Sequence, residues 1–264
     1  MFNRRHFVLT LALSALLTFS ACSSLPQTPA EQAEYKTNND PFEPVNRVVF
    51  DVNDFLDRLL LRPLAELYRI TVPPPLRDRI AGIVKNMTEP VVFANNVLQG
   101  ELTKAGRTAA RFLTNTTAGV GGMFEVANGL GFPRQSGDFG QTLYTWGFTS
   151  GPYLVLPLFG PSTIREAIGL GVDSFMSPWK YLVALGDDGT YLRFMVADTT
   201  ASALVKREEN IEPLDTLREG SLDFYAQMRS VYRQHRAKEL GEPLPSDMPV
   251  YEDFESSQIA PIVH

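Results

Sequence analysis

Histidine and cysteine are nearly absent from this sequence. Its 264 residues contain three histidines and one cysteine, so no disulfide can form within the chain and no multi-cysteine metal site can exist. His6 lies in the leader segment described below and His264 is the last residue, which leaves only His235 in the body of the chain. Catalysis and metal binding by histidine are therefore all but excluded. We expect no cofactor and no metal.

Signatures of nucleotide and nucleic-acid binding are also missing. No stretch matches G-x-x-x-x-G-K-[ST] or G-x-G-x-x-G, so nothing supports a phosphate-binding loop. The formal net charge is −6 and the pI is near 5.2. A nucleic-acid partner requires a basic face, which this composition does not supply.

One serine motif approaches that of the hydrolases without completing it. Residues 160–164, Gly-Pro-Ser-Thr-Ile, are similar to the nucleophile elbow G-x-S-x-G but lack its second glycine. His235 would have to serve as the base, and nothing places it well. We interpret Ser162 as the N-cap of a helix that follows a proline turn. The sequence therefore does not indicate an enzyme.

The first 22 residues resemble the export signal of a bacterial lipoprotein. Two arginines precede a 13-residue apolar core that is too short to span a membrane. The Phe-Ser-Ala-Cys of residues 19–22 resembles a lipobox with phenylalanine where leucine is usual. The alternative is an ordinary signal with a chance cysteine, but the single cysteine falls where acylation requires it. We expect a lipoprotein signal peptide over residues 1–21 and lipidation of Cys22.

The two ends of the mature chain have linker-like compositions. Residues 22–38 are polar and are expected to form a lipidated linker, which spans about 20–24 Å root-mean-square and keeps the folded body close to the bilayer. Ser23 and Ser24 resemble the sorting signal of outer-membrane lipoproteins, in contrast to the aspartate typical of inner-membrane retention. Residues 241–264 are acidic and contain no lysine or arginine. We expect this tail to be extended or disordered.

Apolar residues recur with a helical period through most of residues 39–240, which indicates a single all-α domain. We expect Pro63 to end the first helix and to start a short one through Leu67 and Tyr68. We expect Pro90 to open or kink another helix, and Gly100 to be the C′ residue of the helix that ends at Leu98. The expected helices span residues 45–61, 76–87, 90–98, 101–114, 162–170, 173–185, 190–208 and 213–240.

Residues 119–161 differ from the helical segments around them. They hold ten glycines and four prolines, and an uncharged stretch of 26 residues begins within them at Phe139. Its glycines and prolines interrupt any spanning helix. We interpret the segment as a rigid, non-helical or partly helical apolar element. It is either buried in the body or immersed at shallow depth in lipid.

Four separated blocks together resemble one protein family, the MlaA family, also called VacJ. The first is Asn-Asp-Pro-Phe-Glu-Pro-Val-Asn-Arg at residues 39–47, and the second is Asn-Asn-Val-Leu-Gln-Gly at 95–100. The third is Arg-Phe-Leu-Thr-Asn-Thr-Thr-Ala-Gly at 111–119, and the strongest is DFGQTLYTWGFTSGPYLVLPLFGPSTIRE, which begins at Asp138. The resemblance covers roughly residues 39–235.

The resemblance implies a ring-like helical body with a central amphipathic channel, sunk in the inner leaflet of the outer membrane. Phospholipids that have strayed into the outer leaflet would pass through it towards the periplasm. A soluble periplasmic carrier would then take them to an ATP-driven complex in the inner membrane. Family members sit beside trimeric porins, so the resemblance implies a porin partner. The chain would be a passive, lipid-anchored channel on the periplasmic side of the outer membrane that maintains its lipid asymmetry.

The apolar segment supplies the candidate membrane-contacting residues. If it meets acyl chains, the aromatic and aliphatic side chains are the contacts, with Trp146 and Tyr153 suited to interfacial depth. The alternative is that the segment is simple buried core. The candidates are Trp146, Phe148, Tyr153, Leu154, Val155, Leu156, Leu158 and Phe159.

The helix over residues 45–61 supplies the candidate channel residues. In one interpretation it lines the channel and Asn46, Asn53 and Asp57 face lipid headgroups. In the other, the block around it is only a helix start, with Asp40 as the cap and a proline in the first turn.

Three further questions stay open at this level. Four arginines either bind lipid phosphates or form a solvated surface: Arg62, Arg69, Arg77 and Arg79. The acidic tail either solubilises the chain or recruits the carrier. A structural lipoprotein that scaffolds porins without moving lipid is the main rival function, and a lipid hydrolase using Ser162 is the third.

Overall fold

A computed structural model describes residues 40–184 and 188–242, and within them helices dominate. The π-helical turn η1 (Asp57–Leu61) joins the first two helices. The only strands of the described residues are β1 (Tyr153–Leu156) and β2 (Gly160–Thr163). The helices are α3 (Glu43–Leu56), α4 (Arg62–Thr71), α5 (Pro74–Leu98), α6 (Leu102–Thr117), α7 (Val126–Gly129), α8 (Phe139–Thr145), α9 (Ile164–Met176), α10 (Pro178–Ala184), α11 (Asp188–Glu209), α12 (Ile211–Glu219) and α13 (Phe224–Leu240).

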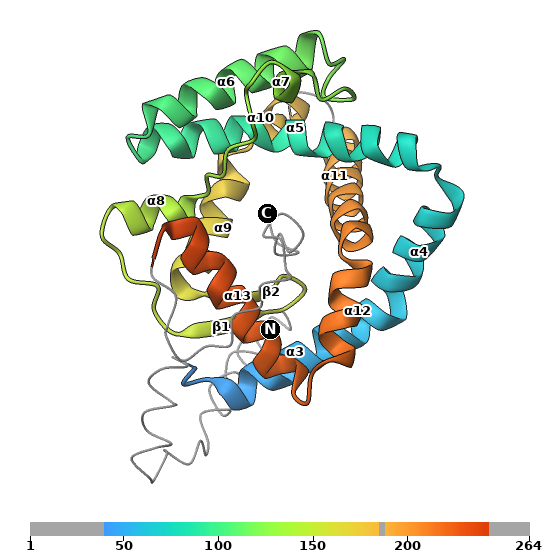
Figure 1. Cartoon of the computed structure of the whole chain (residues 1–264), viewed down its shortest axis with the longest axis vertical. Helices are drawn as coiled ribbons and strands as arrows, with labels where there is room; N and C mark the ends of the chain where they lie inside the picture. The colour runs from blue at the N-terminus through green and yellow to red at the C-terminus, as the bar shows by residue number, and fades with distance from the viewer. Residues whose placement is uncertain (1–39, 185–187, 243–264) are drawn as a thin grey trace, which may run out of the picture.

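The predicted helical class and ring-like arrangement are confirmed. Figure 1 shows α3, α4, α5 and α9 following one another around an open centre of the ribbon. Helix α13 and the β-hairpin complete the ring between α9 and α3. The two strands are antiparallel, with Tyr153 opposite Thr163 and Leu156 opposite Gly160. The signal peptide, the linker with Cys22, and the tail from residue 243 onward lie outside the described residues.

Two prolines do not break helices where the sequence predicted. The Arg62 N–H donates to the Asp57 carbonyl, which is the i→i−5 bond of a π turn, and Pro63 then occupies the first turn of α4, where its missing N–H costs little. Helix α5 likewise runs without interruption past Pro90. The prediction that Pro63 starts a short helix through Leu67 and Tyr68 is confirmed by α4, although the π turn joins that helix to α3 without a break. The prediction that Pro90 opens a helix is wrong. Gly100, at φ 77°, is the predicted left-handed residue after α5.

The helix predicted over residues 213–240 is in fact two helices. Helix α12 ends at Glu219, and α13 begins after Asp223, whose carboxylate accepts a hydrogen bond from the Ala226 N–H at 3.2 Å. An aspartate in this position is a preferred N-cap and starts a new helix. The break lets α13 change direction and run beside the β-hairpin towards α8 and α9 (Figure 1).

A small apolar core forms where α3, the hairpin and α13 meet. It contains Phe50, Tyr153, Val155 and Tyr225. The Phe50 and Tyr225 rings pack edge to face with centroids 5.5 Å apart, and the Tyr153 and Tyr225 rings do so at 6.2 Å. Much of the remaining interior is polar or charged, as the site below shows.

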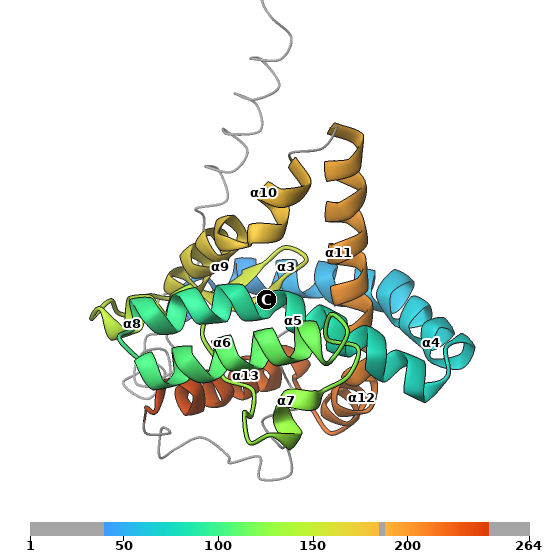
Figure 2. The same cartoon turned by 90° about the horizontal axis from the view of Figure 1, so that it is seen from above.

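Helices α10 and α11 stand out of the plane of the ring. Figure 2 shows them rising on one side, whereas α12, α13 and α7 lie towards the other. Among the described residues, none of the helices combines the length and the hydrophobicity needed to cross a membrane.

Candidate functional site

Asn46 binds the backbone of the β-hairpin from the inner side of α3. Its Nδ2 donates to the Tyr153 carbonyl at 3.1 Å and to Asp40 Oδ1 at 2.8 Å, while its Oδ1 accepts from the Val155 N–H at 2.9 Å. The residue is buried. Its amide therefore completes the hydrogen bonding of a strand edge and has no capacity left for a headgroup, so the prediction that Asn46 faces headgroups is wrong.

Asn53 repeats this arrangement two helical turns later. Its Nδ2 donates to the Leu156 carbonyl at 2.9 Å, and its Oδ1 accepts from the Leu158 N–H at 2.8 Å. Leu158 has φ 67° in the hairpin turn, a conformation that a leucine adopts only when its surroundings hold it there. The structure thus assigns Asn53 to the hairpin turn, and its predicted headgroup-facing role is corrected as well.

Asp57, the third predicted headgroup residue, binds an arginine that is wholly buried. Arg207 on α11 has 0% of its surface exposed, and its Nε and Nη2 lie 2.6 and 3.0 Å from the two Asp57 carboxylate oxygens. Its Nη1 also donates to the Asn210 carbonyl at 3.4 Å. Because Asp57 opens the π turn, this pair attaches α11 to the ring at the irregular point between α3 and α4. The Asp57 carboxylate thus binds Arg207 of α11, and its headgroup-facing role stays a prediction.

Asp40 joins the start of α3 to α13. Its Oδ2 accepts from Arg229 Nη1 at 2.7 Å and from the Tyr225 hydroxyl. Burial and the neighbouring Asp40 carboxylate raise the pKa of Tyr225. The N-cap of α3 is Phe42, with no side-chain cap, so the alternative that Asp40 caps this helix is wrong.

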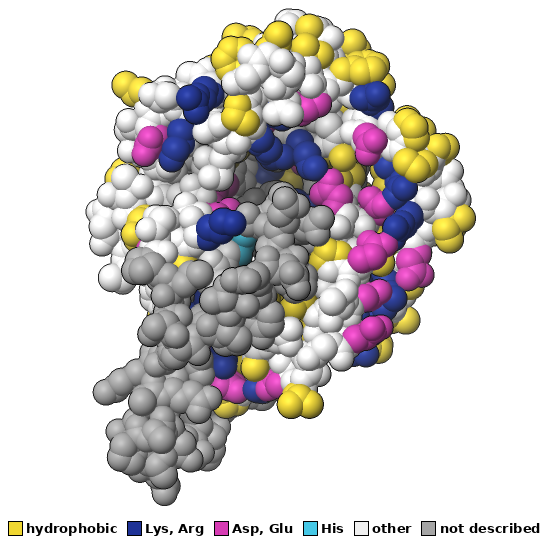
Figure 3. All heavy atoms as spheres, in the orientation of Figure 1, with side chains coloured by type: hydrophobic (Ala, Val, Ile, Leu, Met, Phe, Trp, Pro, Cys, Tyr) yellow, Lys and Arg dark blue, Asp and Glu magenta, His cyan; other side chains and the backbone are white. Residues whose placement is uncertain are grey.

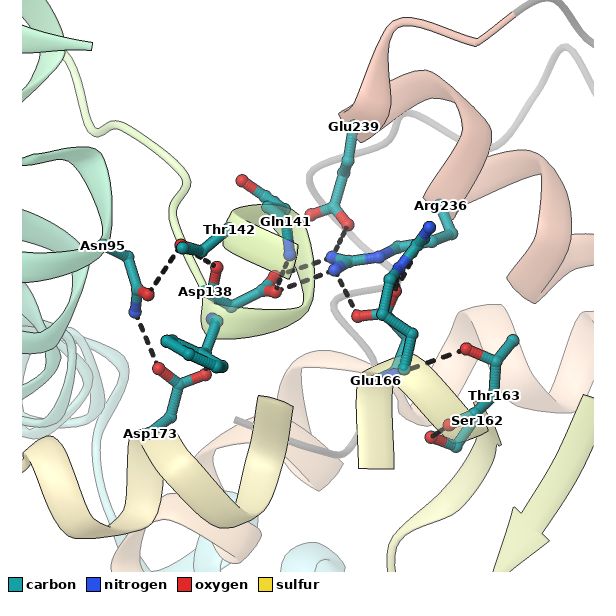
Figure 4. A network of polar contacts seen from close by, with 12 residues as sticks. Asn95, Asp138, Gln141, Thr142, Ser162, Thr163, Glu166, Asp173, Arg236 and Glu239 are labelled. Atoms are coloured by element: carbon teal, nitrogen blue, oxygen red, sulfur yellow. Dashed lines mark hydrogen bonds and ion pairs between the residues drawn. The ribbon is translucent and has the colours of Figure 1, made fainter. Parts of the chain in front are cut away.

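A second buried network joins α8, α9 and α13 (Figure 4). Arg236 donates from Nη1 and Nη2 to the two Asp138 carboxylate oxygens at 2.6 and 2.7 Å, and it also binds Glu166. Asp138 in turn caps α8 by accepting from the Gln141 N–H at 2.8 Å. Glu239 lies 2.9 Å from the same guanidinium. A single arginine thus holds carboxylates from three helices.

The cap of α9 is the residue after the one predicted. Thr163 Oγ1 accepts from the Glu166 N–H at 3.3 Å. Ser162 lies in β2, buried, and its hydroxyl donates to the Thr163 carbonyl at 3.2 Å. The prediction that Ser162 caps the helix is therefore wrong by one residue.

Asn95 and Asp173 hold α5 against α8 and α9 (Figure 4). Asn95 Nδ2 donates to Asp173 Oδ1 at 2.7 Å, and Asn95 Oδ1 accepts from the Thr142 hydroxyl at 2.9 Å. Asp173 Oδ2 accepts from the Phe139 N–H at 2.9 Å. Burial outweighs these hydrogen bonds and raises the pKa of Asp173 to about 6.

The close contact of α8 with α9 depends on glycine. A Cβ on Gly140 would lie 1.8 Å from Glu166 Oε2, and one on Gly169 would lie 2.5 Å from the Gly140 nitrogen. A larger residue at Gly169 would meet the backbone of α8 and push the two helices apart, whereas one at Gly140 would collide with the Glu166 carboxylate and the Arg236 guanidinium. The resemblance block that begins at Asp138 therefore contains residues that assemble the ring.

The side of α3, η1 and α4 that faces away from this polar interior is apolar and exposed. We call it the outer apolar face, and each of its members has more than half of its surface exposed. Figure 3 shows hydrophobic side chains along the rim of the ring beside α4. A soluble monomer rarely exposes so many neighbouring large apolar side chains. The members are Val48, Val52, Phe55, Leu59, Leu60, Leu67 and Ile70.

The predicted membrane-contacting residues divide into three groups. Trp146, Phe148, Leu158 and Phe159 are exposed, and Leu154 and Leu156 are half-buried. Tyr153, only 2% exposed, and Val155 belong to the core. Successive side chains of a strand point to opposite faces, and the inward face of β1 packs on α3 and α13. The prediction of lipid contact is therefore wrong for Tyr153 and Val155 and stays a prediction for the other six.

The four arginines offered as phosphate ligands are engaged within the protein. Arg62 lies 2.9 Å from Asp215 and 3.1 Å from Glu66. Arg69 binds Glu212 and Arg77 binds Glu208, while the Arg79 guanidinium lies 4.3 Å from the centre of the Phe124 ring. Figure 3 shows acidic and basic side chains together where α4 and α12 lie. The first three link α4 and α5 to α11 and α12, so neither a phosphate site nor a purely solvated surface describes them.

The buried cations Arg207, Arg229 and Arg236 were not singled out from the sequence. Their partners Asp57, Asp40 and Asp138 lie roughly 100 to 190 residues away along the chain. A single sequence contains no signal for pairing at that distance. Among the described residues there is no group of three or more His, Cys, Asp or Glu side chains arranged to hold a metal ion.

Comparison with known proteins finds a family model and two named relatives that match most of this chain. A family model described as "MlaA lipoprotein" matches residues 38–239. The "Intermembrane phospholipid transport system lipoprotein MlaA" of Haemophilus influenzae is 31% identical over 255 residues, covering 91% of this chain and 96% of that protein. The Escherichia coli (strain K12) protein of the same name is 30% identical over 229 residues, covering 85% and 84%.

A solved structure has the same fold. It comes from work on the structural basis for maintenance of bacterial outer membrane lipid asymmetry, and it superposes with a TM-score of 0.62 at 31% sequence identity. The match covers 76% of this chain and 98% of that one.

Proposed function

This chain belongs to the MlaA lipoprotein family, and we propose that it is a passive phospholipid channel of the outer membrane. It takes mislocalised phospholipids from the outer leaflet and passes them to a periplasmic carrier, which maintains the lipid asymmetry of that membrane. Relatives about 30% identical over most of their length are named as lipoproteins of an intermembrane phospholipid transport system. The chain is anchored through Cys22, faces the periplasm, and sits beside a trimeric porin.

One observation carries the proposal: the outer side of α3, η1 and α4 is apolar and exposed, whereas the inner side of α3 carries buried polar side chains that bind the hairpin. On α3, the exposed Val48 and Val52 point away from the polar interior, where Asn46 and Asn53 bind the hairpin. A helix of a water-soluble domain has the opposite arrangement, with its apolar side packed inward. Lipid hydrocarbon around the ring would bury the outer apolar face. The hydrogen bonds of the interior would hold the ring rigid in the membrane.

The physical problem that such a ring solves is the exposure of lipid tails. A phospholipid that moves through water exposes about 30 CH₂ groups, at a cost of roughly 20–25 kcal/mol. A route that shields the tails and accepts the headgroup removes most of this barrier. Such a route needs no nucleotide, and transport through it follows the lipid gradient and the affinity of the carrier that takes the lipid.

The test is transfer of phospholipid in a purified system. The full lipoprotein is reconstituted into vesicles that contain a fluorescent phospholipid, and lipid-free periplasmic carrier is added without ATP. We expect lipid to appear on the carrier faster than from protein-free vesicles. If an inserted lipoprotein gives the protein-free rate, the channel proposal fails and a structural role as a scaffold for porins replaces it.

A further inference from the structure

Helices α10 and α11 form a pair whose base is attached to the ring and whose far end is not. At the base, Arg207 binds Asp57, Glu208 binds Arg77, and Glu209 accepts from Lys85 Nζ at 2.7 Å. Trp179 at the start of α10 donates from Nε1 to the Met87 carbonyl at 2.7 Å. Figure 2 shows both helices extending from this base to one side of the ring.

The part that extends exposes several large apolar side chains. The side chains of Leu182, Leu192 and Val196 are 59%, 64% and 57% exposed, and Phe175, at the end of α9 next to the pair, is 75% exposed. From residue 189 to residue 200 most side chains of α11 are exposed. Water does not favour an arrangement in which large aliphatic side chains cover a projecting helix pair.

Ionisable groups on the pair avoid its apolar surface. Lys180 donates from Nζ to the Ser174 hydroxyl at 2.9 Å, and its charge also acts on Asp198, which is partly buried on α11. Arg193 lies near the far end of α11, where a long side chain can extend its charge to a polar boundary.

We propose that the α10–α11 pair inserts into lipid hydrocarbon beyond the leaflet that holds the ring and reaches the headgroup region of the opposite leaflet. This deepens the proposed function and rests on it. The exposed part of α11, residues 189–200, is about 18 Å long, and one leaflet of hydrocarbon is about 15 Å thick. The exposed apolar side chains of the pair, like those of the outer apolar face, are favoured in hydrocarbon over water.

The position of Tyr191 agrees with this depth. Tyr191 is exposed near the start of α11, at the far end of the pair, and Arg193 follows it. The Tyr181 hydroxyl instead donates to the Phe175 carbonyl at 2.7 Å. Tyrosine and arginine are suited to the boundary between hydrocarbon and headgroups. The pair therefore sets the depth of the ring and brings the protein into contact with lipids of the leaflet from which they are to be removed.

The test measures the depth of single labelled positions in the full lipoprotein. Cys22 is the only cysteine, so Leu192→Cys, Val48→Cys and Leu222→Cys each introduce one site for the fluorophore NBD, and the unsubstituted protein controls for label on Cys22. Val48 reports on the outer apolar face. Leu222 is fully exposed in the turn between α12 and α13. Figure 2 shows these two helices on the other side of the ring from the α10–α11 pair. Vesicles of phosphatidylethanolamine and phosphatidylglycerol carry doxyl-labelled lipid, and iodide is the aqueous quencher.

We expect doxyl lipid to quench NBD at position 192 at least about threefold more than at 222, and iodide to show the reverse order. If doxyl lipid quenches the label at position 48 while iodide quenches the label at position 192, the pair does not insert, but the proposed function is not contradicted. Iodide access at both 48 and 192 overturns the proposed function itself. Protection of 192 from both quenchers overturns the proposal in favour of a protein contact, and Leu182→Cys repeats the test on α10.

Discussion

Asn46 and Asn53, two helical turns apart on α3, make the same pair of contacts with the β-hairpin. Each donates to one backbone carbonyl and accepts from the N–H two residues later, Tyr153 with Val155 and Leu156 with Leu158. Helix α3 therefore takes the place of a third strand along the edge of β1. The same helix presents Val48 and Val52 to its surroundings, so a single element separates the apolar outside of the ring from its hydrogen-bonded inside.

Replacement of Asn46 should lower the stability of the fold more than replacement of Asn53. Asn46→Ala leaves the buried Tyr153 carbonyl, the Val155 N–H and the Asp40 carboxylate without this partner, and we expect the free energy of unfolding to fall by about 2–4 kcal/mol. Asn53→Ala acts at a part-buried site, and we expect a fall of about 1–2 kcal/mol. Urea denaturation of both variants gives the comparison. Equal small effects would show that the hairpin does not depend on α3.

The Asp57–Arg207 pair should behave as one unit. Arg207→Ala leaves a carboxylate unpaired beside the buried end of α11, and we expect a loss of about 3–5 kcal/mol in unfolding free energy. The double variant Asp57→Ala, Arg207→Ala should cost clearly less than the sum of the two single changes. A double-mutant cycle by denaturation measures this coupling. Additive single effects would contradict the pair as the attachment of α11.

Asp173 should make stability depend on pH in a defined direction. Burial raises its pKa from 3.8 to about 6 in the folded chain, so between these values the folded state binds the proton that the unfolded state has released. Protonation of Asp173 therefore adds to the free energy of unfolding. This added stability is fully present below about pH 4 and is lost as the pH rises through about 6, by roughly 3 kcal/mol at most.

Asp173→Asn isolates the effect. Between pH 4 and pH 6 the unfolding free energy of the wild type should fall relative to that of the variant. Above pH 7 the difference between the two should stay constant. Denaturation curves at a series of pH values provide the measurement. A difference that is constant across this range would show that the carboxyl titrates normally in the folded protein.

The outer apolar face should govern membrane binding without governing the fold. In a Cys22→Ala background, which removes the proposed anchor, Val48→Glu together with Val52→Glu should lower binding to vesicles on the order of 100-fold. Each charge placed in hydrocarbon costs about 2.5–3.5 kcal/mol at the bilayer centre and less near the interface. Both side chains are exposed, so circular dichroism should be unchanged. Flotation measures binding, and Leu222→Glu is the matched surface control. Equal flotation of both variants would contradict lipid contact by this face.

The helical class was predictable because apolar residues with a helical period occupy most of the chain. Helix ends were less predictable where proline was the signal. Pro63 does lie at the start of α4, but a π turn joins that helix to α3, and Pro90 lies inside the continuous α5. A local pattern contains no information about such a turn, because the Asp57–Arg207 pair that accompanies it joins residues 150 positions apart.

In the candidate site, too, local features were predictable and those set by long-range contacts were not. Exposed apolar residues such as Phe148 could be singled out from composition alone, but the alternation that buries Tyr153 and Val155 could not, since no partner strand was known. Asn46 was correctly placed on the polar side of its helix. Its role was wrong because a polar side chain that faces inward can bind backbone as readily as ligand, and only the fold decides between them.

The most direct test of the central claim is the amount of phospholipid in the outer leaflet of the outer membrane. It is measured in cells that lack the gene and in cells complemented with wild type or with Cys22→Ala. We expect deletion to raise surface phospholipid and only the form with Cys22 to restore the low level. Surface phospholipid that stays unchanged on deletion would contradict removal of lipid by this chain and would favour a structural lipoprotein beside porins.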